Sequence, residues 1–105
     1  MTYEEIITKV RETFKGTDVS MIKEHLAYQF NITGEGEGIF YVEVRDGKLY
    51  IEPYEYYDRH AKFICSADIL FRIITGKLDP VKAFTHGTLK VEGDLGKALL
   101  LKELI

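Results

Sequence analysis

The sequence predicts an α+β domain in which about five helices cover one face of a five-stranded, mainly antiparallel sheet. Segments with helical periodicity stand at both ends of the chain, and segments of alternating polarity lie between them. A two-residue hairpin signal, Asp46-Gly47, joins two of the alternating segments. With 105 residues, of which 46% are apolar, the chain fits one globular domain spanning residues 1–105.

The N-terminal segment has the pattern of an amphipathic helix. Thr2 is the expected N-cap, and Gly16 marks the expected end of the helix. The apolar residues at helical spacing are Tyr3, Ile6, Ile7, Val10 and Phe14. A second, short helix is expected after Asp18, which would cap it. Its apolar face would consist of Val19, Ile22 and Leu26.

Alternation of apolar and polar residues predicts three strands in the middle of the chain. The strands cover residues 28–33, 40–45 and 48–52, and Pro53 ends the third. A glycine-rich turn at residues 34–38 joins the first two. These segments therefore predict a three-stranded meander.

The Asp46-Gly47 turn fixes the register of the second and third strands. A two-residue loop at this position places Val44 opposite Leu49. Val42 then lies opposite Ile51, on the same face. Turn chemistry and hydrophobic pattern agree, so this hairpin is the firmest local prediction.

The next part of the chain predicts a strand followed by two helices. Residues 61–65 are a short apolar strand, and Ser66 caps a helix that ends at Gly76. Asp79-Pro80 opens another short helix, with a capping residue followed by proline at the first helical position. That helix stops at Gly87.

A fifth strand at residues 88–92 precedes a last helix that is unusually apolar. A helix packed on one side needs an apolar stripe only about 100° wide. Here the apolar residues point in several directions: Leu95, Ala98, Leu99, Leu100, Leu101, Leu104 and Ile105. This surplus indicates a helix sandwiched on two sides, an oligomer interface, or a lid over an apolar cavity.

The formal net charge of −3 argues against nucleic acid as a partner, because phosphate binding requires a basic face. The charge is unevenly distributed. Residues 1–58 carry 6 Lys and Arg against 12 Asp and Glu, whereas residues 59–105 carry 8 against 5. The basic half is compatible with transient contact with an anionic membrane surface. An ordinary scatter of solvated charge is the alternative.

The sequence carries no signal for secretion or membrane insertion. The N-terminus is acidic, and no apolar run approaches the ~18 residues of a membrane span. Glu103-Leu104-Ile105 does not match the peroxisomal tripeptide. The lone Cys65 excludes an intramolecular disulfide. We therefore expect a cytoplasmic protein.

No group of residues has the spacing of a catalytic or metal site. The histidines lie at no metal-type spacing from one another or from Cys65. Asp58 and His60 form the one stretch that resembles an acid/base pair, and most such stretches are solvated loops. The glutamates of residues 34–38 would repel phosphate. We expect no catalytic residue, no metal, no cofactor and no enzymatic activity.

Residues 76–94 carry the most specific motif in the chain. They combine Gly-x-Leu-Asp-Pro at residues 76–80, Ala83-Phe84, and Gly-x-Leu-x-x-x-Gly-Asp at residues 87–94. This pattern resembles the signature of the sterol carrier protein type-two family. The Ser66–Gly76 helix and the Asp46-Gly47 hairpin fall where that family has them, so the resemblance spans nearly the whole chain.

The resemblance implies an apolar cavity between the sheet and the helices that carries a sterol, fatty acid, acyl-CoA or similar lipid-like molecule. Mapped onto this chain, the cavity would be lined by Phe30, Ile32, Phe40, Val42, Ile51, Phe63, Ile69, Ile73, Phe84 and Leu99. For each of these residues, packing in a plain core is the alternative. The nearest cations to an anionic headgroup would be Lys97, Lys102 and Arg72.

A structural or interaction module without a bound lipid is the second hypothesis. The apolar last helix, together with Tyr41 and Tyr50 of the strands, would then form a homodimer or partner interface. The fold alone does not decide between carriage and interaction.

Overall fold

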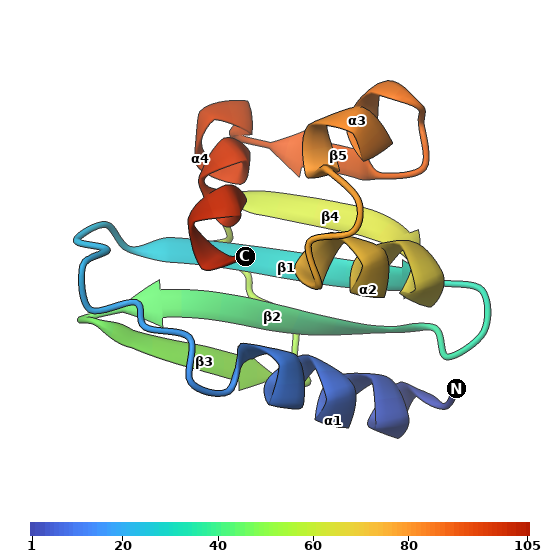
Figure 1. The fold of residues 1–105 in the computed structure, drawn as a ribbon, viewed down its shortest axis with the longest axis horizontal. Helices are drawn as coiled ribbons and strands as arrows, with labels where there is room; N and C mark the ends of the chain where they lie inside the picture. The colour runs from blue at the N-terminus through green and yellow to red at the C-terminus, as the bar shows by residue number, and fades with distance from the viewer.

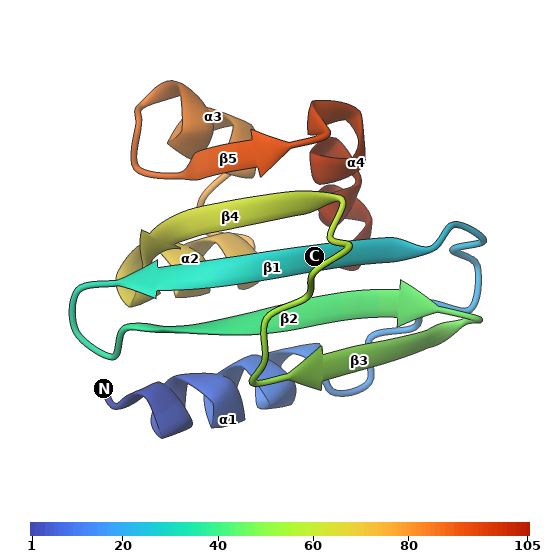
Figure 2. The ribbon, with the colours of Figure 1, turned by 180° about the vertical axis from the view of Figure 1, so that it is seen from behind.

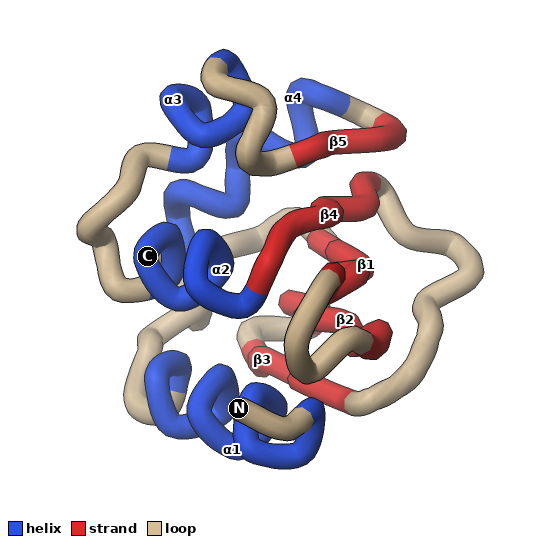
Figure 3. Tube along the Cα trace, turned by 90° about the vertical axis from the view of Figure 1, so that its right-hand side faces the viewer, coloured by secondary structure: helices blue, strands red, loops and turns tan.

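The computed structural model describes residues 1–105 and consists of one five-stranded sheet with helices against one face (Figures 1 and 3). The elements in chain order are α1 (Tyr3–Phe14), β1 (Leu26–Thr33), β2 (Gly38–Arg45), β3 (Lys48–Glu52), β4 (Ala61–Ser66), α2 (Ala67–Ile74), α3 (Pro80–Thr85), β5 (Lys90–Gly93), α4 (Leu95–Leu99) and a 3₁₀ helix (Leu100–Leu104). No helix is both long and apolar enough to cross a bilayer.

The sheet order is β3-β2-β1-β4-β5, and three of its four pairings are antiparallel. β1 and β4 run parallel in the centre. The segment 53–60 that joins β3 to β4 crosses the face of the sheet opposite the helices (Figure 2). The predicted α+β class and the mainly antiparallel sheet are confirmed.

The β2–β3 hairpin has the predicted register. Val42 pairs with Ile51 and Val44 pairs with Leu49. The two turn residues, Asp46 and Gly47, have φ angles of 52° and 75°. Two successive left-handed residues form the turn that matches the twist of paired strands, and glycine adopts this conformation without steric cost.

Three helices begin at the predicted capping residues. Thr2 accepts a hydrogen bond from the Glu5 N–H, and the Glu5 side chain accepts one from the Thr2 N–H, which completes a capping box. Ser66 caps α2, and Asp79 caps α3 with proline at the first helical position. These side chains satisfy backbone donors that have no partner within the helix.

The predicted second helix is wrong, and the expected count of about five helices is slightly too high. Residues 17–25 form an irregular segment with a turn at Ser20 and Met21, where the Asp18 carboxylate accepts a hydrogen bond from the Ser20 N–H at 2.9 Å. Leu26, assigned to that helix, opens β1 and pairs with Val44. A local turn therefore satisfies Asp18, while sheet pairing takes the last residue of the helical pattern.

The hydrophobic core lies between the sheet and helices α1 and α2. Phe30 in its centre stacks on Phe40 and Phe63, with ring centroids 5.0 and 5.1 Å apart. Ile6 and Val10 of α1 are fully buried against it. The centre of the molecule is thus occupied by buried apolar side chains that form one cluster.

The opposite face of the sheet holds a small polar cluster that fastens segment 53–60. Gln29 and Glu43 are each only 3% exposed. The Glu43 carboxylate accepts a hydrogen bond from the Tyr56 hydroxyl at 2.7 Å and lies 2.7 Å from His25 Nε2. The Tyr56 N–H donates to the Gln29 side chain at 3.2 Å. Every buried side-chain polar atom has a partner.

Candidate functional site

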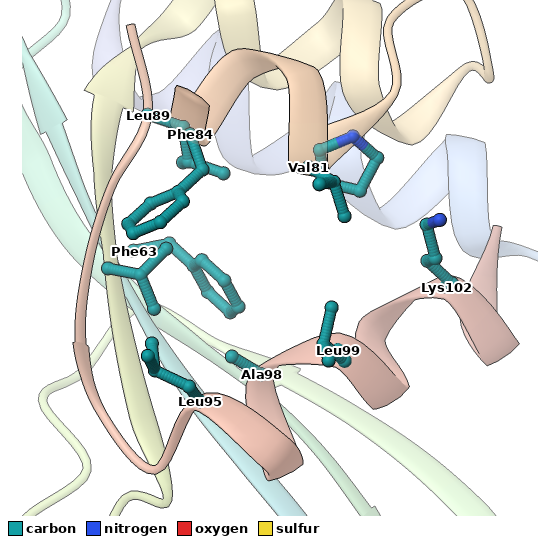
Figure 4. A pocket seen from close by; sticks show the side chains of 10 residues that line it. Phe63, Val81, Phe84, Leu89, Leu95, Ala98, Leu99 and Lys102 are labelled. Carbon is teal, nitrogen blue, oxygen red and sulfur yellow. The ribbon is translucent and has the colours of Figure 1, made fainter. Parts of the chain in front are cut away.

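A largely apolar pocket of about 250 Å³ lies between α3, β5 and α4 (Figure 4). Eight of its ten lining residues are hydrophobic. The lining residues are Phe63, Pro80, Val81, Phe84, Leu89, Val91, Leu95, Ala98, Leu99 and Lys102. An engineered cavity of about 150 Å³ admits benzene, so this pocket has room for part of an apolar ligand.

Phe63 of β4 forms the floor of the pocket. Its ring stacks on Phe30 and meets Tyr28 edge to face, at a centroid distance of 5.4 Å. Val91 pairs with Phe63 across β4 and β5 and continues the floor. The floor is therefore shared with the hydrophobic core, which holds it in place.

Helix α3 supplies one wall. Val81 and Phe84, spaced three residues apart, both border the pocket. Ala83 between them is fully buried and anchors the helix to the core. This short helix is thus held on one side and presents apolar side chains on the other.

Helix α4 supplies the facing wall. Leu95 and Leu99, four residues apart, both line the pocket (Figure 4). The Tyr28 hydroxyl donates a hydrogen bond to the Lys97 carbonyl at 2.5 Å, which ties α4 to β1. Burial raises the pKa of Tyr28, so this hydroxyl keeps its proton.

The apolar surplus of the C-terminal segment is divided between two surroundings. Leu101 and Leu104 of the 3₁₀ helix are buried in the core. Leu95 and Leu99 instead border the pocket and are 55% and 56% exposed. One part of the segment therefore fastens it to the sheet, and the other forms an accessible apolar wall.

Lys102 is the one charged residue that lines the pocket. Its Nζ lies 3.7 Å from the Asp79 carboxylate. The Val81 N–H, which donates to Asp79 at 2.8 Å, lowers the pKa of this carboxyl, and Lys102 adds to the effect. Lys102 and Asp79 are both partly exposed, so water screens this ion pair and it contributes little to stability.

The pocket contains three of the ten residues assigned to the cavity from the sequence: Phe63, Phe84 and Leu99. The other seven lie away from it. Five of these are buried in the closed core, namely Phe30, Ile32, Phe40, Val42 and Ile73. Two are half-buried against that core, namely Ile51 and Ile69. That a ligand contacts these seven residues stays a prediction.

The sequence analysis did not assign the other seven lining residues to the cavity, although part of the signal was present. Six of them were not named as site residues at all, namely Pro80, Val81, Leu89, Val91, Leu95 and Ala98, and the seventh, Lys102, was named only as a candidate cation for an anionic headgroup. The spacings of Val81 to Phe84 and of Leu95 to Leu99 indicate two apolar helix faces. The cavity was instead expected over the centre of the sheet, where α1 and α2 fill the space.

Neither of the other two candidate headgroup cations lines this pocket. Lys97 forms an ion pair with Glu24, and Arg72 lies at the exposed end of α2. Lys102 alone of the three borders the pocket.

Asp58 and His60 do not form an acid/base pair in the structure. Asp58 is exposed, and His60 Nδ1 accepts a hydrogen bond from the Ala27 N–H at 3.0 Å. Burial lowers the pKa of His60, and nearby His25 and Lys97 add to the effect. No group of three or more His, Cys, Asp or Glu side chains is placed to hold a metal ion.

Two curated relatives are similar over most of the chain. Hydroxysteroid dehydrogenase-like protein 2 of Xenopus tropicalis is 32% identical over 107 residues, which cover 91% of this chain. The match spans only 24% of that relative's length. Sterol carrier protein 2 of Arabidopsis thaliana is 30% identical over 98 residues, which cover 76% of this chain and 80% of the relative.

Solved structures share the fold at lower sequence identity. Sterol carrier protein 2 like 2 from Aedes aegypti matches with a TM-score of 0.71 at 20% identity, covering 97% of this chain and 94% of that one. Sterol carrier protein-2 from the same species, solved in complex with palmitate, matches with a TM-score of 0.63 at 22% identity. The latter match covers 98% of this chain and 93% of that one.

The sheet order, the capped helices and the apolar pocket thus occur in a chain whose sequence matches a family model almost from end to end. The matching model is that of the SCP-2 sterol transfer family, and the match covers residues 8–105. The chain therefore belongs to the SCP-2 sterol transfer family.

Proposed function

We propose that the protein binds and carries an apolar, lipid-like molecule in the pocket between α3 and α4, without catalysing a reaction. The observation that carries this proposal is a pocket of about 250 Å³ with eight hydrophobic residues among its ten. A sterol, a fatty acid and an acyl-CoA all present the apolar surface that such a lining favours.

The energetics suit a carrier. Burying a methylene group is worth about 0.8 kcal/mol relative to water, which is enough to hold an acyl chain out of solution. Transfer from a bilayer replaces one apolar surrounding by another, so its free energy is close to zero. Exchange between protein and membrane is then nearly balanced, as carriage requires.

The volume of the pocket sets a condition on binding. Small-molecule sites usually measure about 300–1,000 Å³, so a long ligand fills this pocket only if a wall moves. None of the five residues of α4 is buried. We propose that α4 moves outward to admit the ligand, while Phe63 and the sheet stay in place.

The comparisons support the ligand class. A protein with this fold has been solved with palmitate bound. The family model describes sterol transfer. Which of these ligand types this chain prefers depends on its own lining residues.

The test is native mass spectrometry of protein purified without detergent, followed by titration with a fluorescent fatty acid. We expect a co-purifying lipid or micromolar binding of the probe. Leu99→Glu should weaken binding by about tenfold or more, because a charge in the apolar wall costs at least ~1.4 kcal/mol when a chain covers it. The matched control is Met21→Glu, at an 81% exposed position outside the pocket.

Binding that Leu99→Glu leaves unchanged would place the ligand elsewhere. A protein that neither co-purifies with lipid nor binds the probe would contradict the proposal.

An interaction module remains the second candidate, and the exposed Leu95 and Leu99 favour it. Strand register puts Tyr41 and Tyr50 on the face of the sheet opposite the helices. Tyr41 packs there against Tyr56, with ring centroids 5.1 Å apart. One interface therefore cannot include both these tyrosines and α4. Sedimentation equilibrium would reveal a dimer, and a dimer that Leu99→Glu dissociates would favour this second candidate.

A further inference from the structure

We propose that His60 makes the pocket acid-sensitive: when its imidazole takes up a proton, the start of α4 loosens and the ligand is released. This inference rests on the proposed function, because α4 is a wall of the same pocket. Three segments meet at His60, namely β1, segment 53–60 and the junction of β5 with α4.

His60 ties strand β1 to the residue from which α4 starts. Its backbone N–H donates to the Ala27 carbonyl at 2.8 Å, and its Nδ1 accepts a hydrogen bond from the Ala27 N–H at 3.0 Å. Its own carbonyl accepts the Asp94 N–H at 2.9 Å. Figure 2 shows the end of segment 53–60 beside the turn from β5 into α4. One residue therefore links the position of α4 to the centre of the sheet.

The pocket wall depends on this junction. Asp94 caps α4, because its carboxylate accepts the Lys97 N–H at 3.0 Å. The next residue, Leu95, lines the pocket. None of the five residues of α4 is buried, so burial in the core does not hold the beginning of this helix. A shift of Asp94 therefore moves Leu95 and changes the shape of the pocket.

The hydrogen bond from the Ala27 N–H to Nδ1 exists only with a neutral imidazole. An accepting Nδ1 carries no proton, so the neutral ring of His60 holds its proton on Nε2. A second proton must go to Nδ1, which then donates and no longer accepts. The N–H of Ala27, a fully buried residue, then faces a second donor and loses its partner. Protonation therefore forces the His60 ring away from β1.

The charges around His60 carry this effect to α4. Burial lowers the pKa of His60 most strongly, and His25 and Lys97 lower it further. The ring centroid of His25 lies 5.4 Å from that of His60, and Lys97 belongs to α4. Asp94 and Glu24 act in the opposite direction, but the first caps α4 and the second pairs with Lys97. A protonated His60 therefore repels Lys97 and, with it, the helix.

A cleft beside His60 admits protons but supplies no spare negative charge. The ionisable groups that border this cleft together with His60 are Tyr57, Arg59, Lys62 and Glu92, from its own segment, β4 and β5. Glu92, the one carboxylate among them, pairs with Lys62 at 3.3 Å. His60 itself is half-buried, so water reaches the ring in the folded protein. Protonation therefore needs no unfolding, and no unengaged carboxylate in the cleft compensates for it.

The direction of the pH effect follows from the lowered pKa. A histidine whose pKa is lowered by folding favours the folded arrangement above its ordinary pKa of about 6.5, and this contribution is lost as the pH falls below that value. A loosened α4 covers less of the ligand, so protonation and ligand binding oppose each other. Acid should release the ligand, and by reciprocity a bound ligand should make His60 harder to protonate.

The experiment measures binding of a fluorescent fatty-acid methyl ester at a series of pH values, because this probe has no titrating head group. In the parent protein we expect the affinity to fall about fivefold or more from about pH 7.5 to about pH 5.5. His60→Asn should bind as the parent does at the higher pH and keep that affinity at the lower one. Its amide oxygen replaces Nδ1 as the acceptor and does not titrate.

The matched control is His86→Asn, at an exposed position that does not line the pocket. This variant should keep the pH dependence of the parent protein.

An NMR titration of the ligand-free parent protein tests the coupling without a substitution. The ring resonances of His60 and the amide resonances of Asp94 and Leu95 should change with one common midpoint. Adding the methyl ester should move this midpoint to lower pH.

Two results would overturn the role of His60 and leave carriage intact: ester binding that does not depend on pH, or the same pH dependence in His60→Asn as in the parent. An imidazole titration that leaves the Asp94 and Leu95 amides unmoved would overturn it as well, even if His60→Asn failed to fold. Carriage would fall, and the role of His60 with it, only if the ester bound at no pH.

Discussion

Glu43 is held as a buried carboxylate on the face of the sheet that segment 53–60 crosses. Burial by itself raises the pKa of a carboxyl group. Hydrogen bonds from Tyr56 and His25, with the nearby charge of Arg45, outweigh burial and leave the pKa of Glu43 below its usual value. Glu43 in turn raises the pKa of Tyr56 to about 12, so the phenol keeps the proton that it donates.

The sign of this shift predicts acid sensitivity. A carboxyl whose pKa is lowered by folding contributes stability above its unfolded pKa, and this stability is lost as the pH falls through the folded value. We expect Glu43→Gln to lose about 1–3 kcal/mol at pH 7, because it removes charge-assisted hydrogen bonds. The difference from the parent protein should shrink below about pH 4, near the ordinary carboxyl pKa.

Urea denaturation at a series of pH values measures this dependence. Glu12→Gln, at an exposed position of α1, is the control and should follow the parent curve. If the free energies of unfolding of Glu43→Gln and the parent differed by the same amount at every pH, Glu43 would not be a carboxylate whose pKa is lowered by folding.

For single residues, the sequence predicted the positions of several apolar side chains but none of the contacts between polar ones. The family resemblance assigned the apolar Phe63 to the cavity lining, and Phe63 lies on the pocket floor. The contact of His25 with Glu43 joins residues 18 positions apart, which the pairing of β1 with β2 brings together. Apolar pattern also does not distinguish a buried wall from an exposed one, which is why Val81 and Leu95 were missed.

At the scale of elements, the junction of β5 with α4 decides where the pocket wall stands. Gly93 ends β5 with φ of 108°, and a Cβ atom there would lie 2.6 Å from the His60 carbonyl oxygen. The Asp94 N–H donates to this same carbonyl at 2.9 Å. The close approach of two backbone segments therefore fixes the start of α4.

Gly93→Ala should accordingly destabilise the protein by more than the backbone strain alone. Gly76→Ala is the matched control, because Gly76 also has a positive φ but no atom within 4 Å of the added methyl group. We expect Gly76→Ala to cost about 1–2 kcal/mol and Gly93→Ala to cost more, with weaker fatty-acid binding. Thermal melts and probe titrations of both variants give the comparison, and equal losses would show that the close approach is unimportant.

The elements that sequence reasoning predicted correctly are those with local causes. The hairpin at Asp46-Gly47 and the caps at Ser66 and Asp79 depend on residues a few positions apart. The helix expected after Asp18 failed because Leu26 gains more from pairing with Val44, a partner distant in the chain. The parallel pairing of β1 with β4 has no local signal either.

At the scale of the whole molecule, the well-packed central strands lie apart from the weakly packed helix α4. The pairings of β1 with β2 and β4 form the centre of the sheet, and the core residues on them are buried. Helix α4 is short, has no buried residue and stands at one edge. Its backbone hydrogen bonds should therefore open with a lower free energy than those of the central strands.

Hydrogen–deuterium exchange provides the test. We expect the amides of α3 and α4 to exchange at least tenfold faster than those of β1 and β2 in the ligand-free protein. Palmitate should slow exchange in α3 and α4 and leave the central strands unchanged, because a ligand stabilises only the opening that exposes its site. Protection of α1 by palmitate, with α4 unaffected, would place the ligand in the central core instead.

Every residue that lines the pocket comes from one uninterrupted stretch, from Phe63 to Lys102. α1 and the β1–β3 meander, which complete the core, contribute no side chain to it. The walls of the pocket can therefore be replaced as one segment. Grafting residues 76–102 from a relative should change which ligand the pocket prefers, while residues 1–75 keep their own sequence. In a lipid carrier of the proposed kind, recombination within this one short segment would change the ligand.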